Sequence, residues 1–589
     1  MADLSLGTDR FLFVRTPILS DRVRPMLSRV LCASLAVLFT VGTGTSRADG
    51  PFPPHKIADN TYYVGSQDLA TYLITTPDGH ILINSGFEET VPLIRDAVQT
   101  LGFKPTDVKY ILASHAHSDH VAGHARLKEL TGAQVLVMQG DEEVIRKGGE
   151  GQYLYTDQRW LPCPVDRVLK DREKVTLGGV TLTAHRTAGH TPGCTTWSWR
   201  TTDKEKPLDV VVIGSPNVNP GYQLVGNTAY PAIAADYAAT FRRLKSLPCD
   251  IFLGAHGDYY KLPAKHARLK SSEGSPFIDP QGYTDYVSFK EQAFREELSR
   301  QGGAVTEPVV KHSFFIAGPT FTGIIGEEGE ELWNAGQPAA RDGYVLPNGN
   351  VLIAWSDEVR ELTREKEVVF RYRKSAENAE LGTAQRLANR NTLITELGKR
   401  PRVLEVNPAG EIVVDCPLQP ETDNAHMQTR MARRLPNGNY LAPHLLAFKV
   451  KEYTPQGQVV QEFATDLADL GGRAAENWPF TAIRLKNGNT LVNLTHGNKT
   501  VELDPQGKVV WKVGNEDFPE LKPFADPCGG QRLPNGNTVI ASYGTQGPIK
   551  VFEVNREKQL VWKYTGPHRA HEIQVLTTNG EPIEGEPLK

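Results

Sequence analysis

The strongest constraint on the fold is a short turn sequence that recurs in the second half of the 589-residue chain. Its copies read L-P-N-G-N or a close variant, and they begin at Leu346, Leu387, Leu435, Leu485 and Leu533. An Asn-Gly pair between apolar segments favours the type I′ turn of a β-hairpin. A second turn signature follows, as in D-P-Q-G at 504–507, so each unit of about 50 residues predicts four strands.

Repeats of this length suit the blades of a β-propeller. Residues 312–333 hold only the later strands of a unit, and residues 571–576 hold only a first strand. Together they make one more unit, in which the C-terminal segment pairs with the start of the region. We therefore predict an all-β propeller of six blades over residues 312–589, preceded by a linker at 302–311. The repeat pattern resembles arylsulfotransferase-like and quinoprotein-like propellers.

That resemblance raises the question of a second activity, because arylsulfotransferases use a channel histidine as nucleophile. His444, His496 and His571 are candidates by residue type only, and we expect structural or surface roles for them. An arginine directly precedes the first-strand leucine of four units, at positions 386, 434, 484 and 532. We expect these arginines to support the blades rather than to form an anion-binding ring. A polymer or a protein remains a possible ligand of the propeller.

The first half of the chain carries four potential metal ligands in a row, in the segment HAHSDH at 115–120. They follow an apolar run, 110–113, that predicts a buried strand, and they precede a segment with helical spacing, 121–130. His115 and His117 are two residues apart, so they point to the same side of an extended strand end. Asp119 and His120 lie at the turn into the helix. Nitrogen and carboxylate donors at this density predict a site for two zinc ions.

Two further histidines follow predicted strands. His190 lies on a turn fixed by glycine and proline, G-H-T-P-G, and His256 follows the apolar run 251–255. A lone histidine at a strand end is more often structural than a ligand. Because a two-zinc site needs about six protein ligands, we expect both to complete it. The surrounding strands and helices predict an α/β layered domain over residues 49–301.

The segments HAHSDH (115–120), GHTPGCTTW (189–197) and FLGAHG (252–257) resemble the metallo-β-lactamase superfamily, and within it class B β-lactamases of the third subclass. The resemblance implies an αβ/βα sandwich with the metals between its two sheets. It also implies two sets of zinc ligands, one comprising His115, His117 and His190 and the other comprising Asp119, His120 and His256.

One position bears on the substrate. Related glyoxalases and lactonases place a metal-bridging aspartate where this chain has Ser215. Loss of a bridging anion favours amide hydrolysis over ester hydrolysis, so we expect attack of a zinc-bound hydroxide on a β-lactam, with Asp119 orienting the hydroxide. Tyr222 is the candidate donor to the oxyanion. Ser215 and Asn217 are candidates for holding the carboxylate of the substrate.

Two alternatives stay open at this point. The first keeps the two zinc ions but assigns another ester, lactone or thioester substrate. The second belongs to another class, a propeller binding or scaffold protein whose hydrolase domain is vestigial. In a variant of it, the propeller has its own sulfotransferase activity. The formal net charge of −4 gives no sign of nucleic acid as a partner.

The N-terminus predicts export. Arg22, Arg24 and Arg29 precede the apolar run 30–41, and S-R-A follows at 46–48. This pattern is typical of a signal peptide at 1–48, cleaved after Ala48, which leaves no stable membrane span and a periplasmic or secreted protein. The start can be Met1 or Met26. Five cysteines remain after cleavage, and we expect them to be mostly buried, with at most one or two disulfides.

Overall fold

The computed structural model describes residues 50–203, 206–271, 274–306, 308–544 and 547–589. The predicted signal peptide lies outside these ranges. In the part of the chain that is described, no helix is long and apolar enough to cross a membrane. The five cysteines of this part are all buried and unpaired, so none of the allowed disulfides is formed among them.

The N-terminal region contains two sheets. The first has seven strands in chain order, and its last four strands run parallel. Its strands are β1 (His55–Ala58), β2 (Thr61–Tyr63), β3 (Tyr72–Thr76), β4 (Gly79–Ile83), β5 (Val108–Leu112), β6 (Gln134–Met138) and β7 (Arg167–Leu169). The second sheet has the order β12 (Ile251–Gly254), β11 (Lys206–Ile213), β10 (Thr195–Asp203), β9 (Val180–Arg186) and β8 (Glu173–Leu177).

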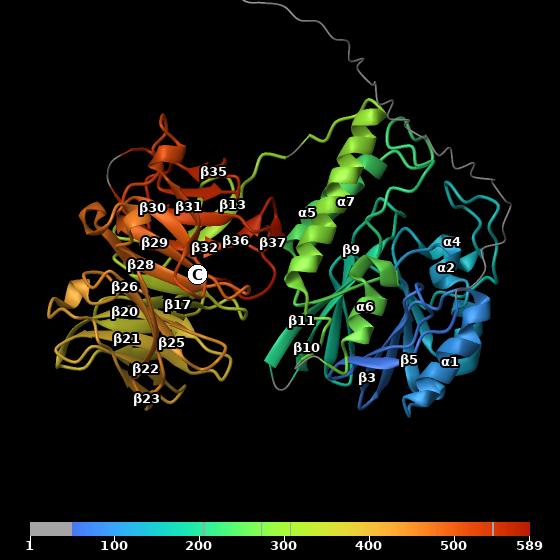
Figure 1. Cartoon of the computed structure of the whole chain (residues 1–589), viewed down its shortest axis with the longest axis horizontal. Helices are drawn as coiled ribbons and strands as arrows, with labels where there is room; N and C mark the ends of the chain where they lie inside the picture. Colours follow the sequence, from blue (N-terminus) through green and yellow to red (C-terminus); the bar gives the residue numbers. More distant parts are fainter. Residues whose placement is uncertain (1–49, 204–205, 272–273, 307, 545–546) are drawn as a thin grey trace, which may run out of the picture. The chain divides into compact units, whose positions relative to one another are not determined.

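Helices cover the outer faces of these two sheets (Figure 1). The helices are α1 (Val91–Thr100), α2 (Ser118–Val121), α3 (His124–Thr131), α4 (Glu142–Arg146), α5 (Ile233–Ser246), α6 (Leu262–Ala267) and α7 (Pro280–Arg300). Side chains of α1, α3 and α4 pack on one face of the seven-stranded sheet. Side chains of α5 and α7 join the core that contains the second sheet.

Strand β4 shows how the sequence builds these layers. Its residues are all buried, and successive side chains point to opposite faces. Ile81 and Ile83 face the core shared with the second sheet, whereas Leu82 packs with the helices of the outer layer. A strand buried on both sides must be largely apolar on both sides, which explains the apolar run Ile81–Ile83. The predicted αβ/βα sandwich is therefore present.

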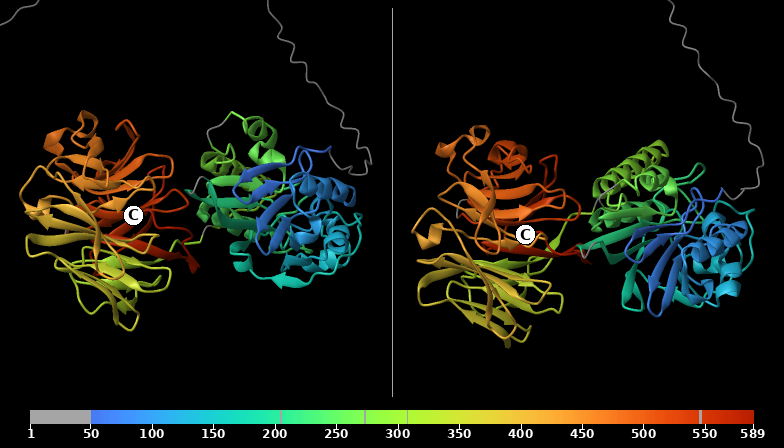
Figure 2. Two further views of the ribbon diagram at one scale, coloured as in Figure 1. Left: turned by 90° about the horizontal axis from the view of Figure 1, so that it is seen from below. Right: turned by 60° about the horizontal axis from the view of Figure 1, so that its bottom comes forward.

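The C-terminal region is all β, and its described residues form six small sheets (Figure 2). Five of these sheets have four strands that follow one another in the chain. They comprise β16 (Asp342–Val345), β17 (Val351–Ala354), β18 (Glu358–Leu362) and β19 (Val368–Arg373); β20 (Asn378–Arg386), β21 (Thr392–Gly398), β22 (Arg402–Val406) and β23 (Ile412–Pro417); β24 (Arg433–Arg434), β25 (Tyr440–His444), β26 (Lys449–Tyr453) and β27 (Val459–Ala464); β28 (Asn477–Arg484), β29 (Thr490–His496), β30 (Lys499–Leu503) and β31 (Val509–Gly514); and β32 (Pro527–Arg532), β33 (Thr538–Ser542), β34 (Val551–Val554) and β35 (Leu560–Tyr564).

The sixth sheet joins the two ends of the region. It contains β13 (His312–Ala317), β14 (Thr322–Ile325) and β15 (Glu331–Asn334), and it also contains β36 (Glu572–Thr578) and β37 (Glu581–Pro582). Strand β36 pairs antiparallel with β13, with Phe315 opposite Gln574. The predicted pairing of the C-terminal segment with the start of the region is confirmed.

The recurrent hairpin differs from the prediction in its turn type. A type I′ turn requires positive φ at both central residues. In the first copy the central residues are Pro347 and Asn348, and only the following Gly349 has a positive φ, of 87°. The Gly349 amide donates to the Leu346 carbonyl over 2.9 Å, which gives a type I turn followed by a left-handed residue. The proline ring fixes φ near −65°, so this sequence excludes a type I′ turn here.

The last asparagine of each repeat has a constant partner. Its amide donates to a buried glutamate on the third strand of the same sheet, as from Asn489 to Glu502 over 2.7 Å. The same glutamate accepts from the recurring arginine of the following sheet, as from Arg532 over 3.0 Å. Equivalent pairs are Arg386–Glu361, Arg434–Glu405 and Arg484–Glu452. The expected structural role of the recurring arginines is confirmed.

Candidate metal centre

Three histidines converge at the ends of two sheets. His115 and His117 follow β5, and His190 lies in the loop between β9 and β10. One ring nitrogen from each lies within 4.8 Å of the other two. The three residues are at most 7% exposed. Three imidazoles that share one buried point fit a tetrahedral zinc ion with a fourth position left open.

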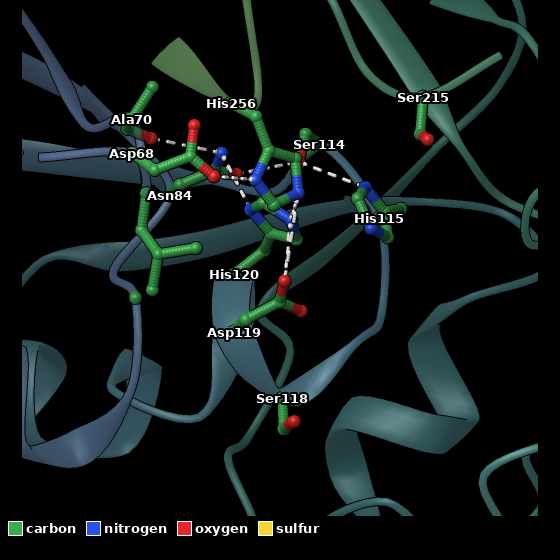
Figure 3. Close-up of polar contacts among 12 residues, drawn as sticks. Asp68, Ala70, Asn84, Ser114, His115, Ser118, Asp119, His120, Ser215 and His256 are labelled. Atoms are coloured by element: carbon green, nitrogen blue, oxygen red, sulfur yellow. Dashed lines mark hydrogen bonds and ion pairs between the residues drawn. The ribbon is translucent and has the colours of Figure 1, made fainter. Parts of the chain in front are cut away.

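A second group of side chains lies beside the first. His120 Nε2 is 3.3 Å from Asp119 Oδ2 and 3.2 Å from His256 Nε2. Asp119 Oδ2 is 3.7 Å from His256 Nε2. Figure 3 shows the three side chains pointing toward one another, with His115 next to them. The ring centroids of His115 and His120 are 4.2 Å apart, so the two groups are neighbours.

The ligands on the strand end are held by their backbone. The Ser114 amide donates to Asn84 Oδ1 over 2.8 Å, and the Ala116 amide donates to Asp141 Oδ2 over 2.8 Å. Asn84 has a positive φ of 68°, a conformation that asparagine tolerates better than most residues. These bonds fix the extended backbone that places His115 and His117 on one side.

Asp141 links the two loops that carry the first histidine group. Besides the Ala116 amide, it accepts from the Thr191 hydroxyl over 2.7 Å and from the Gly193 amide over 2.8 Å. The residue is 1% exposed, and burial raises the pKa of its carboxyl to about 6. The sequence did not single out Asp141, because an acidic residue before E-E-V-I is typical of a helix start.

In His190 and His256, the second ring nitrogen has a carbonyl or carboxylate partner. His190 Nδ1 lies 2.8 Å from the Asn217 carbonyl, and His256 Nδ1 lies 2.7 Å from Asp68 Oδ2. A proton on Nδ1 leaves Nε2 free for a metal ion, and such partners orient the ring. Asp68 lies between β2 and β3 and was also missed by the sequence analysis, since nothing in the surrounding Q-D-L marks it.

The protonation states suit metal binding. Burial, together with the neighbouring imidazoles, holds the pKa of His115 and of His190 well below the ordinary value. Burial lowers the pKa of His117 to about 4. Burial alone would raise the pKa of Asp119, but the His120 and His256 side chains outweigh it and hold that pKa below its usual range. Neutral imidazoles and an ionised carboxylate are the forms that bind zinc.

Ser215 and Asn217, the predicted substrate-carboxylate pair, meet at a third side chain. The Tyr259 hydroxyl lies 3.2 Å from Ser215 Oγ and accepts from Asn217 Nδ2 over 2.9 Å. Tyr259 follows His256 in the short helix after β12 and was not predicted. Ser215 is 2% exposed, and Figure 3 shows it apart from the converging imidazoles.

Tyr222, the predicted oxyanion donor, is also buried, at 2% exposure. Its hydroxyl donates to the His190 carbonyl over 2.9 Å and lies 3.5 Å from His190 Nδ1. In this structure the hydroxyl therefore orients the His190 loop. Its donation to an oxyanion stays a prediction, which requires the side chain to leave this contact.

Residues 70–203 match the Metallo-beta-lactamase superfamily, so the N-terminal region contains a domain of that superfamily. The chain is 30% identical over 133 residues to a hydroxyacylglutathione hydrolase of Anaeromyxobacter dehalogenans, which covers 23% of this chain and 43% of that protein. It is 38% identical over 79 residues to a hydroxyacylglutathione hydrolase of Pelagibacter ubique, covering 13% and 31%. The chain thus spans less than half the length of either of these two relatives.

Solved structures are also similar to part of the chain. The FEZ-1 metallo-beta-lactamase from Legionella gormanii is 46% identical, with 44% of this chain and 99% of that chain covered and a TM-score of 0.43. BJP-1, a subclass B3 metallo-beta-lactamase of Bradyrhizobium japonicum, is 37% identical, with 44% and 97% covered and a TM-score of 0.42.

Proposed function

We propose that this chain is an exported hydrolase that holds two zinc ions and opens the amide bond of a β-lactam. The observation that carries the proposal is the convergence of six side chains into two adjacent groups. His115, His117 and His190 would hold the first ion. Asp119, His120 and His256, all within 3.7 Å of one another through their Oδ2 and Nε2 atoms, would hold the second.

Residues of the chain that surround the metal site have distinct roles in the proposed reaction. Zinc, when bound, supplies a Lewis acid and lowers the pKa of its water to about 7. Asp119 stays ionised and reaches both His120 and His256, so its free carboxylate oxygen can accept a hydrogen bond from the attacking hydroxide and orient it. Ser215 and Asn217 would present a hydroxyl and an amide to the carboxylate of the substrate. Tyr222 would orient His190 and, once turned, donate to the oxyanion.

The side chain at position 215 favours the amide substrate. A carboxylate there would bridge the two ions and reduce the positive charge available to a leaving nitrogen. Ser215 is neutral, and its hydroxyl is already within 3.2 Å of Tyr259. With a neutral side chain at position 215, the second group of ligands would leave more positive charge available to a leaving nitrogen, which suits the opening of a lactam ring.

Hydrolysis of a thioester is the second candidate. The two curated relatives are named hydroxyacylglutathione hydrolases, and this supports testing that substrate class. The absence of a carboxylate at Ser215 counts against it. The class B β-lactamase assignment and the thioester assignment make different predictions for the same protein, so one experiment separates them.

The C-terminal region would be a six-bladed propeller that binds a polymer or protein ligand. Five four-stranded sheets in chain order and a sixth that joins β13 to β36 support this arrangement. The signal sequence at 1–48 supports export to the periplasm or beyond. Mass spectrometry of the protein recovered from the periplasm tests the cleavage, since a start other than residue 49 would contradict it.

The decisive experiment measures zinc per chain together with hydrolysis of a chromogenic cephalosporin and of a hydroxyacylglutathione. We expect two zinc ions and cephalosporin turnover. Changing a residue that only surrounds the metal ligands typically costs about 10- to 100-fold in activity. Asp119→Ala should reduce turnover by more than that, because Asp119 would itself be a ligand. Asp157→Ala, an exposed aspartate, serves as the control. Turnover of the thioester alone would move the assignment to the second candidate, and loss of metal with no turnover would contradict both.

A further inference from the structure

Charged and aromatic side chains gather at one end of the C-terminal sheets. Arg341, Arg430 and His571 precede or begin the first strands of their sheets, and Glu380 lies in the first strand of another. These four residues come from four different sheets, and contacts of Arg341 and Arg430 with Glu380 and of His571 with Ala340 bring them together. None of them belongs to the arginine–glutamate pairs that also bind the turn asparagines.

Two arginines share one carboxylate. Arg341 Nη2 lies 2.7 Å from Glu380 Oε2, whereas Arg430 Nη1 lies 3.4 Å from Glu380 Oε1. The side chains of Arg341 and Arg430 are only 17% and 11% exposed. His426 also approaches Glu380, at 3.3 Å. A single carboxylate with two guanidinium groups around it leaves positive charge uncompensated.

The same two arginines also have unused donors. Arg341 Nη1 and Arg430 Nε are buried and have no hydrogen-bond partner among the described residues. A buried donor without an acceptor costs about 1–3 kcal/mol, and more when it is charged. Native proteins rarely leave such donors unsatisfied, so an acceptor supplied by another molecule would fit here, where both arginines also share one carboxylate.

The neighbouring side chains add no competing negative charge. His571 stacks on Tyr543 with ring centroids 4.3 Å apart, and Arg569 lies over the Tyr543 ring at 4.9 Å. Burial lowers the pKa of His571 to about 4, so this imidazole is neutral. Its Nδ1 lies 3.2 Å from the Ala340 carbonyl, which holds it beside Arg341.

Deeper in the same region the charges are already balanced. Arg433 lies 2.8 Å from Asp342 and 3.6 Å from Glu572, and the Lys589 ammonium lies 3.6 Å from Asp342. Two acids therefore face two bases there. Among the described residues, neither carboxylate of this inner group forms an ion pair with Arg341 or Arg430.

We propose that Arg341 and Arg430 bind an oxyanion, the carboxylate or phosphate group of a small molecule. Guanidinium groups present planar forks of donors that match the two oxygens of such a group. Arg341 Nη1 and Arg430 Nε would donate to the anion. Glu380 would be the internal carboxylate that competes with the anion for the two arginines. This site is independent of the zinc centre and of its substrate.

Titration calorimetry on the full chain, with inorganic phosphate as the probe and potassium chloride at constant ionic strength, tests the proposal. Arg430→Met should weaken phosphate binding by about 10- to 100-fold. Glu380→Gln should strengthen it several-fold, because the competing charge is gone. Arg484→Met is the matched control, since it removes a buried arginine that already has Glu452 and Gln461 as partners. It should leave phosphate affinity unchanged.

Three results would overturn the proposal. One is phosphate binding no tighter than chloride. Another is equal losses in Arg430→Met and Arg484→Met, which would report stability rather than a site. A third is binding that Arg430→Met does not change and that a zinc chelator abolishes, which would place the anion at the metal centre. If Arg430→Met does not fold, Arg430→Lys keeps the charge but loses the fork, and its affinity must still fall.

Discussion

The Asp141 carboxylate accepts the hydroxyl of Thr191 over 2.7 Å and thereby ties the loop after β6 to the loop that carries His190. Its other two bonds reach the amides of Ala116 and Gly193. One buried side chain thus fixes the separation of the two loops that supply the first histidine group. No described cation forms an ion pair with it.

Replacing Asp141 with asparagine should therefore affect metal affinity more than folding. The amide keeps one acceptor but turns the other into a donor, which faces an N–H or O–H group. We expect zinc affinity to fall about 10- to 100-fold, and the free energy of unfolding of the metal-free protein to fall by only about 1–3 kcal/mol. Chelator competition and urea unfolding measure the two effects.

Asp166→Asn is the control for this change. Asp166 also accepts a backbone amide, that of Val135, but it lies outside the metal loops. It should cost stability without changing zinc affinity. Equal zinc affinities for the two variants would show that Asp141 does not position the ligands.

The contact between Asp68 and His256 predicts a selective loss of one metal ion. The carboxylate lies 2.7 Å from His256 Nδ1 and also accepts the Asp258 amide over 3.0 Å. Asp68→Asn keeps an acceptor but removes the negative charge beside Nδ1–H, so the second ion should bind about 10- to 100-fold more weakly while the first is retained. Zinc content at limiting metal should fall from two ions to one. Asp258→Asn should keep both, and loss of both ions in Asp68→Asn would contradict this division.

The sequence predicts the ligands but not the residues that hold them. Four ligands stand in one dense segment, and His190 and His256 follow recognisable strands. Asp68 and Asp141 act across 188 and 50 residues of chain, through contacts that only the packed sheets create. The predicted turn type was wrong for a local reason. Pro347 occupies a position at which a type I′ turn needs a positive φ. The pairing of β36 with β13 succeeded because the incomplete units at the two ends of the region complement each other.

Because His444 is buried, we predict that the C-terminal region becomes less stable as the pH falls. It is fully buried, with Nδ1 3.1 Å from the Gln428 carbonyl and Nε2 2.7 Å from the Tyr453 hydroxyl. Burial lowers its pKa to about 3. Near pH 6.5 the imidazole therefore binds a proton in the unfolded chain but not in the folded chain. Stability therefore falls as the pH falls, by about 2 kcal/mol between pH 7 and 5 from this group.

His444→Gln should remove that part of the pH dependence. Urea unfolding at pH 7 and pH 5 measures it, with the metal removed so that the zinc ligands contribute equally to each variant. His496→Gln is the control, because that imidazole is 44% exposed. The unfolding free energy of the control should drop between the two pH values as in the unmodified protein. An identical drop in His444→Gln would mean that the buried imidazole is not the titrating group.

Glu502 connects two neighbouring sheets, so its substitution tests how far the stability of one sheet depends on the other. It is 1% exposed and accepts from Asn489 of its own sheet, from Arg532 of the next, and from Arg556. Glu502→Gln keeps the shape but leaves two guanidinium groups without their counter-charge. We expect it to lower the free energy of unfolding by about 2–4 kcal/mol.

Glu462→Gln is the control. It removes a half-exposed partner of Lys449 and should lower the free energy of unfolding by less than about 1 kcal/mol. Because each recurring glutamate spans two sheets, unfolding in Glu502→Gln should remain a single transition at lower urea. A separate early transition would show instead that the sheets on either side of Glu502 unfold independently.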